Sequence, residues 1–378
     1  MISPVKFSIF IKISIYLVGI VAFVWMLYIG QSIIVPLLFA TFIAVLLHPV
    51  VNLMVRKKIN RIVAITITLI LSFAVIAAFS IFLYAQISQF SDSWPIIVQK
   101  FTVLIDQSTR WISEYFNIKP EKITAWITES KNDMMSNGNS AIGSTLMSFG
   151  SSLVVLFIIP VYIFMILYYQ PLLIEFLNQL FGKERQTQVR VVISKIKNVI
   201  QRYLVGLVLE ALIVAVLNVA GLLILGIDYA ILLGVLGALL NVIPYIGGIV
   251  GVALPMMIAL VTESSPWYAV YVLIIYYAIQ LIDNNFIVPK IVASKVKINA
   301  LVSIVVILAF GSLWGVAGMF ISIPLTAILK VIFDHVESLK PWGYLLGDTM
   351  PVPNFLKIKI PIKIPIKIPI KIPGKKKS

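Results

Sequence analysis

Long apolar runs, separated by short charged connections, fill most of the sequence. A helix needs about 20 consecutive apolar residues to cross the hydrocarbon core of a lipid bilayer. Runs of about that length lie at residues 9–29, 33–55, 62–84, 145–169, 204–225 and 267–282. Because a transmembrane helix satisfies its backbone hydrogen bonds internally, these runs predict an all-α, polytopic membrane protein.

One later segment departs from this pattern because it is interrupted. Apolar runs at 231–242 and 249–261 are each only about a dozen residues long, which is too short to cross a bilayer. Pro244 blocks a continuous helix between them, and Gly247 and Gly248 allow the chain to turn. We therefore predict a re-entrant hairpin or a broken helix pair in this segment.

The last long apolar run, residues 298–333, exceeds the length of one membrane crossing. It is interrupted between Gly311 and Gly318, and it can form two more spans or a second hairpin. The chain then has about eight transmembrane helices. Four parts follow along the sequence: the first three spans (1–85), a helical extracytoplasmic region (86–144), a transmembrane core with the hairpin at 231–261 (145–348), and a low-complexity Lys/Ile/Pro tail (349–378).

Four clusters of lysine and arginine predict the orientation. They precede the first span, separate the second from the third and the fourth from the fifth, and follow the sixth. All four lie on one side of the membrane if the hairpin returns to the face from which it entered, and such clusters mark the cytoplasmic side. Both termini are then cytoplasmic. Residues 86–144 lie outside, as a small helical domain or as an amphipathic pair on the membrane surface.

Two charged segments favour contact with the membrane surface. From Val189 to Tyr203, one face of a predicted helix is apolar, and the opposite face carries basic residues that include Lys197. This pattern is typical of a helix at the cytoplasmic lipid interface, and a contact between subunits is the alternative. The tail can lie on an anionic leaflet through its lysines or have no specific role.

Composition narrows the class of function. Apolar residues make up 60% of the chain and cysteine is absent, which excludes disulfides and thiolate metal sites. The net charge of +15 is concentrated in the tail and in the orienting clusters, so it does not indicate nucleic-acid binding. Walker A, G-x-S-x-G and H-E-x-x-H motifs are missing from the sequence. We expect no enzymatic activity and no cofactor or metal, and we expect transport to be driven by a gradient.

Polar residues within the apolar runs form the candidate site, because a charged side chain in a bilayer usually faces a cavity or a partner. Broken helix ends also leave backbone groups free to bind a solute or ion. The candidate pathway residues are Glu210, Asn241, Pro244, Tyr245, Gly247, Gly248, Gln280, Asp283 and Asn284. Each feature also has a structural alternative. Glu210 can pair with a basic residue, and the polar group at 280–284 can end a helix. The hairpin can serve helix packing without binding a ligand. His48 is interpreted as a polar residue at a helix end.

Three segments stand out by their order of Gly, Pro and Asn residues. They are Asn241-Val-Ile-Pro-Tyr-Ile-Gly-Gly-Ile-Val-Gly251, Gln280-Leu-Ile-Asp-Asn-Asn-Phe-Ile-Val-Pro-Lys290 and Leu313-Trp-Gly-Val-Ala-Gly-Met-Phe-Ile-Ser-Ile-Pro-Leu325. Together they resemble the signatures of the autoinducer-2 exporter family of bacterial permeases, over residues 10–348. The resemblance implies an eight-span inner-membrane protein that forms homo-oligomers. Asn299-Ala300 departs from it, because His-Pro is common there in the family, and this departure bears on local gating or coupling.

Three functions are open from the sequence. The first is a permease that exports a small polar solute, such as an autoinducer-2-like signal, along the candidate pathway. The second is a sodium or other cation/proton antiporter in which Asp283 and Glu210 are alternately protonated. The third is a membrane scaffold without transport, in which the polar residues only bridge helices. The expected partners are the lipid bilayer, a solute or cation, and further copies of the chain.

Overall fold

The computed structural model describes residues 8–116, 153–182, 185–243, 247–292 and 298–350. Throughout these ranges the structure is helical, and the extended pairing within them is a single bridge between Ile298 and Gly347. Seven of the described helices are long and apolar enough to cross a membrane. The predicted fold class, an all-α polytopic membrane protein, is confirmed.

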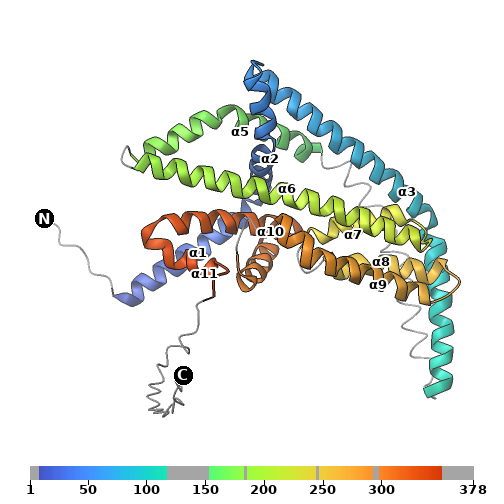
Figure 1. The fold of residues 1–378 in the computed structure, drawn as a ribbon. Helices are drawn as coiled ribbons and strands as arrows, with labels where there is room; N and C mark the ends of the chain where they lie inside the picture. Colours follow the sequence, from blue (N-terminus) through green and yellow to red (C-terminus); the bar gives the residue numbers. More distant parts are fainter. Residues whose placement is uncertain (1–7, 117–152, 183–184, 244–246, 293–297, 351–378) are drawn as a thin grey trace, which may run out of the picture.

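The order of the helices is shown in Figure 1: α1 (Ile9–Ile29), α2 (Gln31–Arg56), α3 (Arg61–Phe116), α5 (Leu153–Leu180), α6 (Gln186–Ile224), α7 (Ala230–Asn241), α8 (Gly247–Thr262), α9 (Trp267–Ile282), the π-helix η2 (Asp283–Val292), α10 (Ala300–His335), the short η4 (Glu337–Leu339) and α11 (Lys340–Leu346). Two helices merge segments that the sequence separated. α3 continues from the third span into the polar region, and α6 joins the basic amphipathic segment to the fifth span. The tail and the part of the polar region after Phe116 lie outside the described residues.

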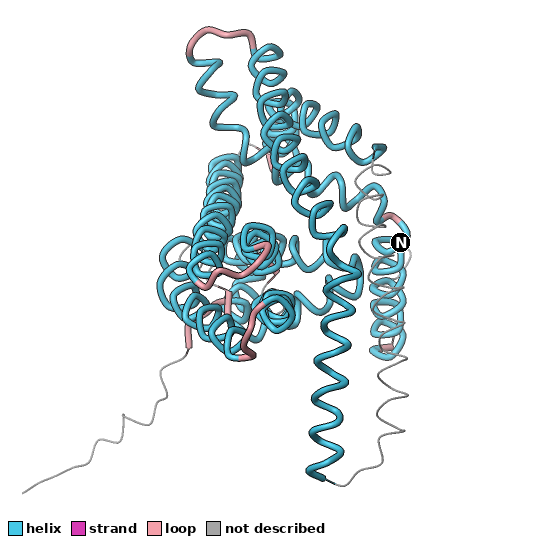
Figure 2. Tube along the Cα trace, turned by 90° about the vertical axis from the view of Figure 1, so that its right-hand side faces the viewer, coloured by secondary structure: helices cyan, strands magenta, loops and turns pink. Residues whose placement is uncertain are grey.

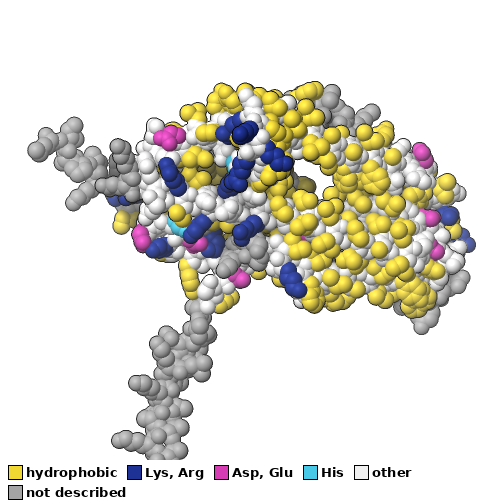
Figure 3. Space-filling model, turned by 45° about the horizontal axis from the view of Figure 1, so that its top comes forward, with side chains coloured by type: hydrophobic (Ala, Val, Ile, Leu, Met, Phe, Trp, Pro, Cys, Tyr) yellow, Lys and Arg dark blue, Asp and Glu magenta, His cyan; other side chains and the backbone are white. Residues whose placement is uncertain are grey.

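The surface of α1 shows why this fold requires lipid around it. α1 has no buried residue, and Phe10, Leu17 and Trp25 are 79%, 60% and 66% exposed. Apolar side chains of this size are unfavourable in water and are well accommodated among lipid tails. Hydrophobic side chains also cover most of one end of the face seen in Figure 3. The exposed apolar surface is therefore the lipid-facing surface.

α6 is the central helix of the described fold. It contacts α2, α5, α7, α9, η2 and α10, and it runs across the molecule in Figure 1. Small residues allow its neighbours to approach closely. A Cβ atom added to Gly234 of α7 would lie 2.6 Å from the backbone nitrogen of Val219 in α6. Close backbone approach is a common source of packing energy between membrane helices, and it holds α7 firmly on α6.

The long helix α3 supports the hairpin from outside. Its residues Phe90, Trp94 and Ile97 form a buried cluster with Leu232 of α7 and Ile258 of α8. Beyond this cluster α3 extends past the other helices, toward the lower end of the view in Figure 2. The middle of α3 therefore braces the interrupted segment, although the two lie far apart in the sequence.

The first interrupted segment is a helical hairpin, as predicted. α7 and α8 lie against each other, and a Cβ atom on Gly251 would come within 3.3 Å of the Cα atom of Gly237. Gly247 is buried against the backbone of Leu240 and Asn241. Glycine at these positions lets the two short helices meet at backbone distance. Pro244 and Tyr245 lie outside the described residues.

The second interruption is a sharp turn within α10. Gly315 has φ 61° and ψ −145°, a combination that glycine adopts freely and that strains other residues. After the turn, Gly318 packs against the backbone of Phe310. In a straight helix, residues eight apart lie about 12 Å apart. The contact therefore shows that α10 folds back on itself between Gly311 and Gly318, where the sequence predicted a break.

Candidate functional site

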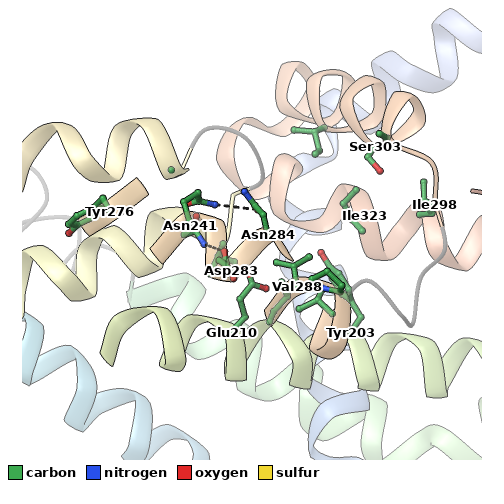
Figure 4. Close-up of a pocket in the computed structure, with 18 of the residues that line it drawn as sticks. Tyr203, Glu210, Asn241, Tyr276, Asp283, Asn284, Val288, Ile298, Ser303 and Ile323 are labelled. Carbon is green, nitrogen blue, oxygen red and sulfur yellow. Dashed lines mark hydrogen bonds between the residues drawn. The ribbon is translucent and has the colours of Figure 1, made fainter. Parts of the chain in front are cut away.

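A cavity of about 1210 Å³ lies between α6, the α7–α8 hairpin, α9 with η2, and α10 (Figure 4). Six of the nine candidate residues line it: Glu210, Asn241, Gly248, Gln280, Asp283 and Asn284. Gly247 lines a small adjoining space together with Asn241 and Gly248. The structure thus brings together residues from α6, α7, α8, α9 and η2, which span more than 70 positions in the sequence.

The contact between Asn241 and Asp283 joins two of these elements. Asn241 is the last residue of α7, and Asp283 is the first residue of η2. The Asn241 amide nitrogen donates a hydrogen bond of 2.8 Å to Oδ2 of Asp283. Asp283 is 2% exposed, and its other oxygen, Oδ1, has no hydrogen-bond partner in the described structure. The carboxyl group therefore keeps one acceptor available inside the cavity wall.

The π-helix η2 explains how so many residues of one segment reach the cavity. Hydrogen bonds in a π-helix link residues five apart, and such helices are rare and frequent at functional sites. Asp283, Asn284, Val288, Pro289 and Val292 all line the cavity, at spacings of four to five residues. The polar group that follows Ile282 does not end the helix, as one alternative held, but lies in a helix that continues to Val292.

Glu210 reaches the same cavity from α6. Its side chain is 6% exposed, and in Figure 4 it points toward the region of Asp283. α6 and η2 approach closely because Gly206, one turn before Glu210, leaves room for the backbone of Ile291. No lysine or arginine is found among the described lining residues. The alternative in which Glu210 pairs with a basic residue therefore has no support from the cavity wall.

Several lining residues were not predicted from the sequence. Tyr203, Tyr276, Ser303 and Asp348 add three hydroxyl groups and a carboxyl group to the wall. Helical spacing could have found two of them, because Tyr276 precedes Gln280 by one turn and Tyr203 precedes Glu210 by two turns. In the sequence, Tyr203 instead belongs to the apolar face of the predicted amphipathic helix.

Asp348 and Ser303 reach the cavity through a contact near the end of the described chain. The side chain of Asn299 accepts a hydrogen bond from the backbone of Val302 at 2.9 Å and so caps α10. The same side chain donates to the carbonyl oxygens of Leu345 and Gly347, at 2.7 and 3.1 Å. Asn299 therefore fastens the end of α11 and the residue after it to the start of α10.

Comparison with known proteins identifies the family. The sequence profile described as AI-2E family transporter matches residues 14–338, which is most of the chain. The chain belongs to the AI-2E transporter family. The resemblance drawn from three motifs is thereby confirmed, and the AI-2E transporter described here is a multi-pass membrane protein of a bacterial transporter family.

Individual relatives match this AI-2E transporter over nearly their full length. YueF of Bacillus subtilis is 23% identical over 341 residues, covering 87% of this chain and 92% of the relative. A protein of Escherichia coli named AI-2 transport protein TqsA is 26% identical over 336 residues, covering 84% and 90%. At these identities the relatives support a role as a membrane permease more strongly than they support a particular substrate.

Proposed function

We propose that this AI-2E transporter is a secondary permease of the bacterial inner membrane that exports a small polar solute, such as an autoinducer-2-like signal. Both termini lie in the cytoplasm, and the protein acts as a homo-oligomer. The observation that carries the proposal is the cavity in which buried polar groups of α6, α7 and η2 meet. The name of TqsA supports the proposed substrate.

The chemistry of the cavity suits a neutral solute with several hydroxyl groups. Small-molecule sites usually have volumes of about 300–1,000 Å³ and a few placed polar groups in a mostly apolar wall. The cavity of about 1210 Å³ is larger than this range but has the same kind of wall, because Leu207, Val252 and Ile307 line it together with the carboxyl, amide and hydroxyl groups. Asp283 and Glu210 accept hydrogen bonds from such a solute, and the amides of Gln280 and Asn284 both donate and accept.

Binding of the solute is coupled in this proposal to the Asn241–Asp283 contact. The contact closes the cavity wall between the hairpin and η2 at 2.8 Å. A hydroxyl group that replaces the Asn241 amide at Asp283 frees α7 from η2 and permits the two elements to move apart. Gly247 and Gly248 then serve as the point about which the hairpin moves.

A second function, cation/proton antiport, is favoured by one specific observation. Glu210 and Asp283 are both buried and line the same cavity, whose described wall contains no basic side chain. Two buried carboxyl groups without a fixed countercharge favour uptake of a proton or a cation. On this alternative, sodium and protons occupy the carboxyl groups in turn.

Flux measurements in proteoliposomes test both functions. The full chain is compared with Asp283→Asn and Glu210→Gln, and with Asp228→Asn as a matched control, because Asp228 is exposed and lies outside the cavity. The permease predicts solute efflux that both cavity variants lower about tenfold or more, while the control retains wild-type flux. Proton movement driven by a sodium gradient, lost in the cavity variants, would establish the antiporter instead. If the folded protein moves neither solute nor cation, both transport functions are excluded and the membrane scaffold is the function that stays.

A further inference from the structure

A second polar cluster lies apart from the cavity, where α2, α3, α5 and α6 meet. It consists of His48 on α2, Arg61 at the start of α3, Gln170 on α5 and Lys197 on α6. Basic side chains gather at this end of the molecule in Figure 3. The interpretation of His48 as a polar residue at a helix end is wrong, because α2 continues to Arg56, and His48 is buried within this helix in contact with Lys197. None of the four residues lines the cavity, so the cluster has a role of its own.

The hydrogen bonds of the cluster fix the state of its histidine. Nζ of Lys197 lies 2.8 Å from Nδ1 of His48, and because lysine only donates, Nδ1 accepts. Nε2 then carries the ring proton and donates to Oε1 of Gln170 at 2.9 Å. Arg61 donates to the same Gln170 oxygen at 3.1 Å and to the backbone carbonyl of Leu167. His48 is thus neutral, and the positive charges belong to Arg61 and Lys197.

These two positive charges have no negative partner in the described structure. The ion pairs found there, within 4.0 Å, are Lys330–Asp334 and Lys340–Glu337, both far along the chain from this cluster. Nε of Arg61 is buried and has no hydrogen-bond partner. Arg61 and Lys197 otherwise donate only to neutral groups, and an oxyanion offers the missing negative charge. The arrangement therefore points to a bound anion.

We propose that this cluster binds the phosphate group of an anionic phospholipid, between the guanidinium of Arg61 and the ammonium of Lys197. Arginine recognises phosphate through two parallel N–H groups, and lysine adds a point charge. Exposed apolar side chains that follow Arg61 in α3 supply a surface for the acyl chains, because Ile62 and Val63 are each 47% exposed. Inorganic phosphate makes no contact with an apolar surface, whereas the acyl chains of a lipid do, and this difference favours a lipid as the source of the phosphate group.

The side of the membrane agrees with this ligand. Arg61 belongs to the basic cluster between the second and third spans, and Lys197 to the cluster between the fourth and fifth, and the orientation predicted from the sequence places both clusters in the cytoplasm. The cytoplasmic leaflet carries anionic lipids, and each lysine or arginine near it contributes about 1 kcal/mol of attraction. A lipid held here would tie α3 and α6 together without any link to the solute in the cavity.

Lipid binding to the purified full chain tests the proposal. Native mass spectrometry in detergent measures the affinity for phosphatidylglycerol and for phosphatidylcholine with the same acyl chains, and inorganic phosphate is tested as a competitor. We expect phosphatidylglycerol to bind about tenfold more tightly than phosphatidylcholine. Arg61→Gln and Lys197→Gln should each lower that affinity about tenfold. Inorganic phosphate at millimolar concentration should displace little of the lipid.

Lys57→Gln is the matched control, because Lys57 is exposed at the end of α2 and the substitution removes the same charge at the same side of the membrane. Its affinity should stay within about twofold of wild type. An equal loss in Lys57→Gln, or equal binding of both lipids to the wild type, would overturn the site. If inorganic phosphate binds tightly and displaces the lipid, the proposal that the bound phosphate group belongs to a lipid would be wrong. If Arg61→Gln does not fold, the proposal is still tested by the affinity of Lys197→Gln for phosphatidylglycerol and by the preference of the wild type for this lipid over phosphatidylcholine.

Discussion

Gly206 offers the sharpest test of how α6 positions η2 and its polar residues. Gly206 is buried on α6, and a Cβ atom at this position would lie 2.8 Å from the carbonyl oxygen of Ile291 and 3.3 Å from the Cα atom of Val292. Ordinary contacts of a Cβ atom begin at about 3.4 Å, so Gly206→Ala displaces the η2 backbone by roughly half an ångström. Both contacting atoms are backbone, and therefore no side-chain rotation can relieve the clash.

The displacement has a cost in stability and a cost in transport. Overpacking of this kind typically costs about 1–3 kcal/mol. Misplacement of reacting groups by 1 Å costs enzymes about 100-fold, and by analogy we expect a half-ångström shift of Asp283 and Asn284 to lower solute flux about tenfold. The melting temperature in detergent and the flux in proteoliposomes should both fall.

Gly19→Ala is the control for this prediction, because Gly19 lies on α1 with no atom within 4 Å of an added Cβ. In this variant, flux and melting temperature should match the wild type. If Gly206→Ala also behaved like the wild type, the close approach of α6 and η2 would not position the cavity residues, and the reasoning would fail.

Three other substitutions give equally specific expectations. Asn241→Ala removes the hydrogen bond to Asp283 that closes the cavity wall, and because such bonds to charged groups contribute about 1.5–3 kcal/mol, α7 should separate from η2 more readily and solute efflux should rise at least tenfold; unchanged efflux would contradict the role of this contact. Gly315→Ala places an L-residue at φ 61°, which costs about 1–3 kcal/mol, so the melting temperature should fall, and an unchanged value would refute the turn. Asn299→Ala removes the cap of α10 and the bonds to the end of α11 and the residue after it, so amide hydrogen exchange in residues 340–347 should accelerate while that in α6 stays constant.

The sequence located most of the helices because membrane helices must be long, apolar and internally hydrogen-bonded. The hairpin was also predictable, since Pro244 and the two following glycines interrupt runs that are too short to cross a bilayer. What the sequence did not predict was the continuity of some helices. The polar residues after Ile282 lie in a π-helix that continues the chain, and its packing against Gly206 depends on tertiary structure.

The candidate site was partly predictable because the membrane also restricts where polar residues can lie. Polar residues in apolar runs are costly, so they could be selected as a group, and five of them line one cavity. Tyr203 was missed because its ring is compatible with an apolar helix face. Asp348 was missed because it follows the last span and reaches the cavity wall only where Asn299 fastens the chain back onto α10.

Cysteine accessibility tests the central claim, that the cavity is a water-filled path through a protein surrounded by lipid. The chain has no cysteine, so each variant carries a single thiol. Ser303→Cys places it on the cavity wall, and Leu308→Cys places it on the same helix at a side chain that is 60% exposed on the apolar surface. We predict that a membrane-impermeant maleimide labels Ser303→Cys in vesicles and blocks flux, and that Leu308→Cys does not react. Protection of Ser303→Cys, or equal labelling of both variants, would contradict the account.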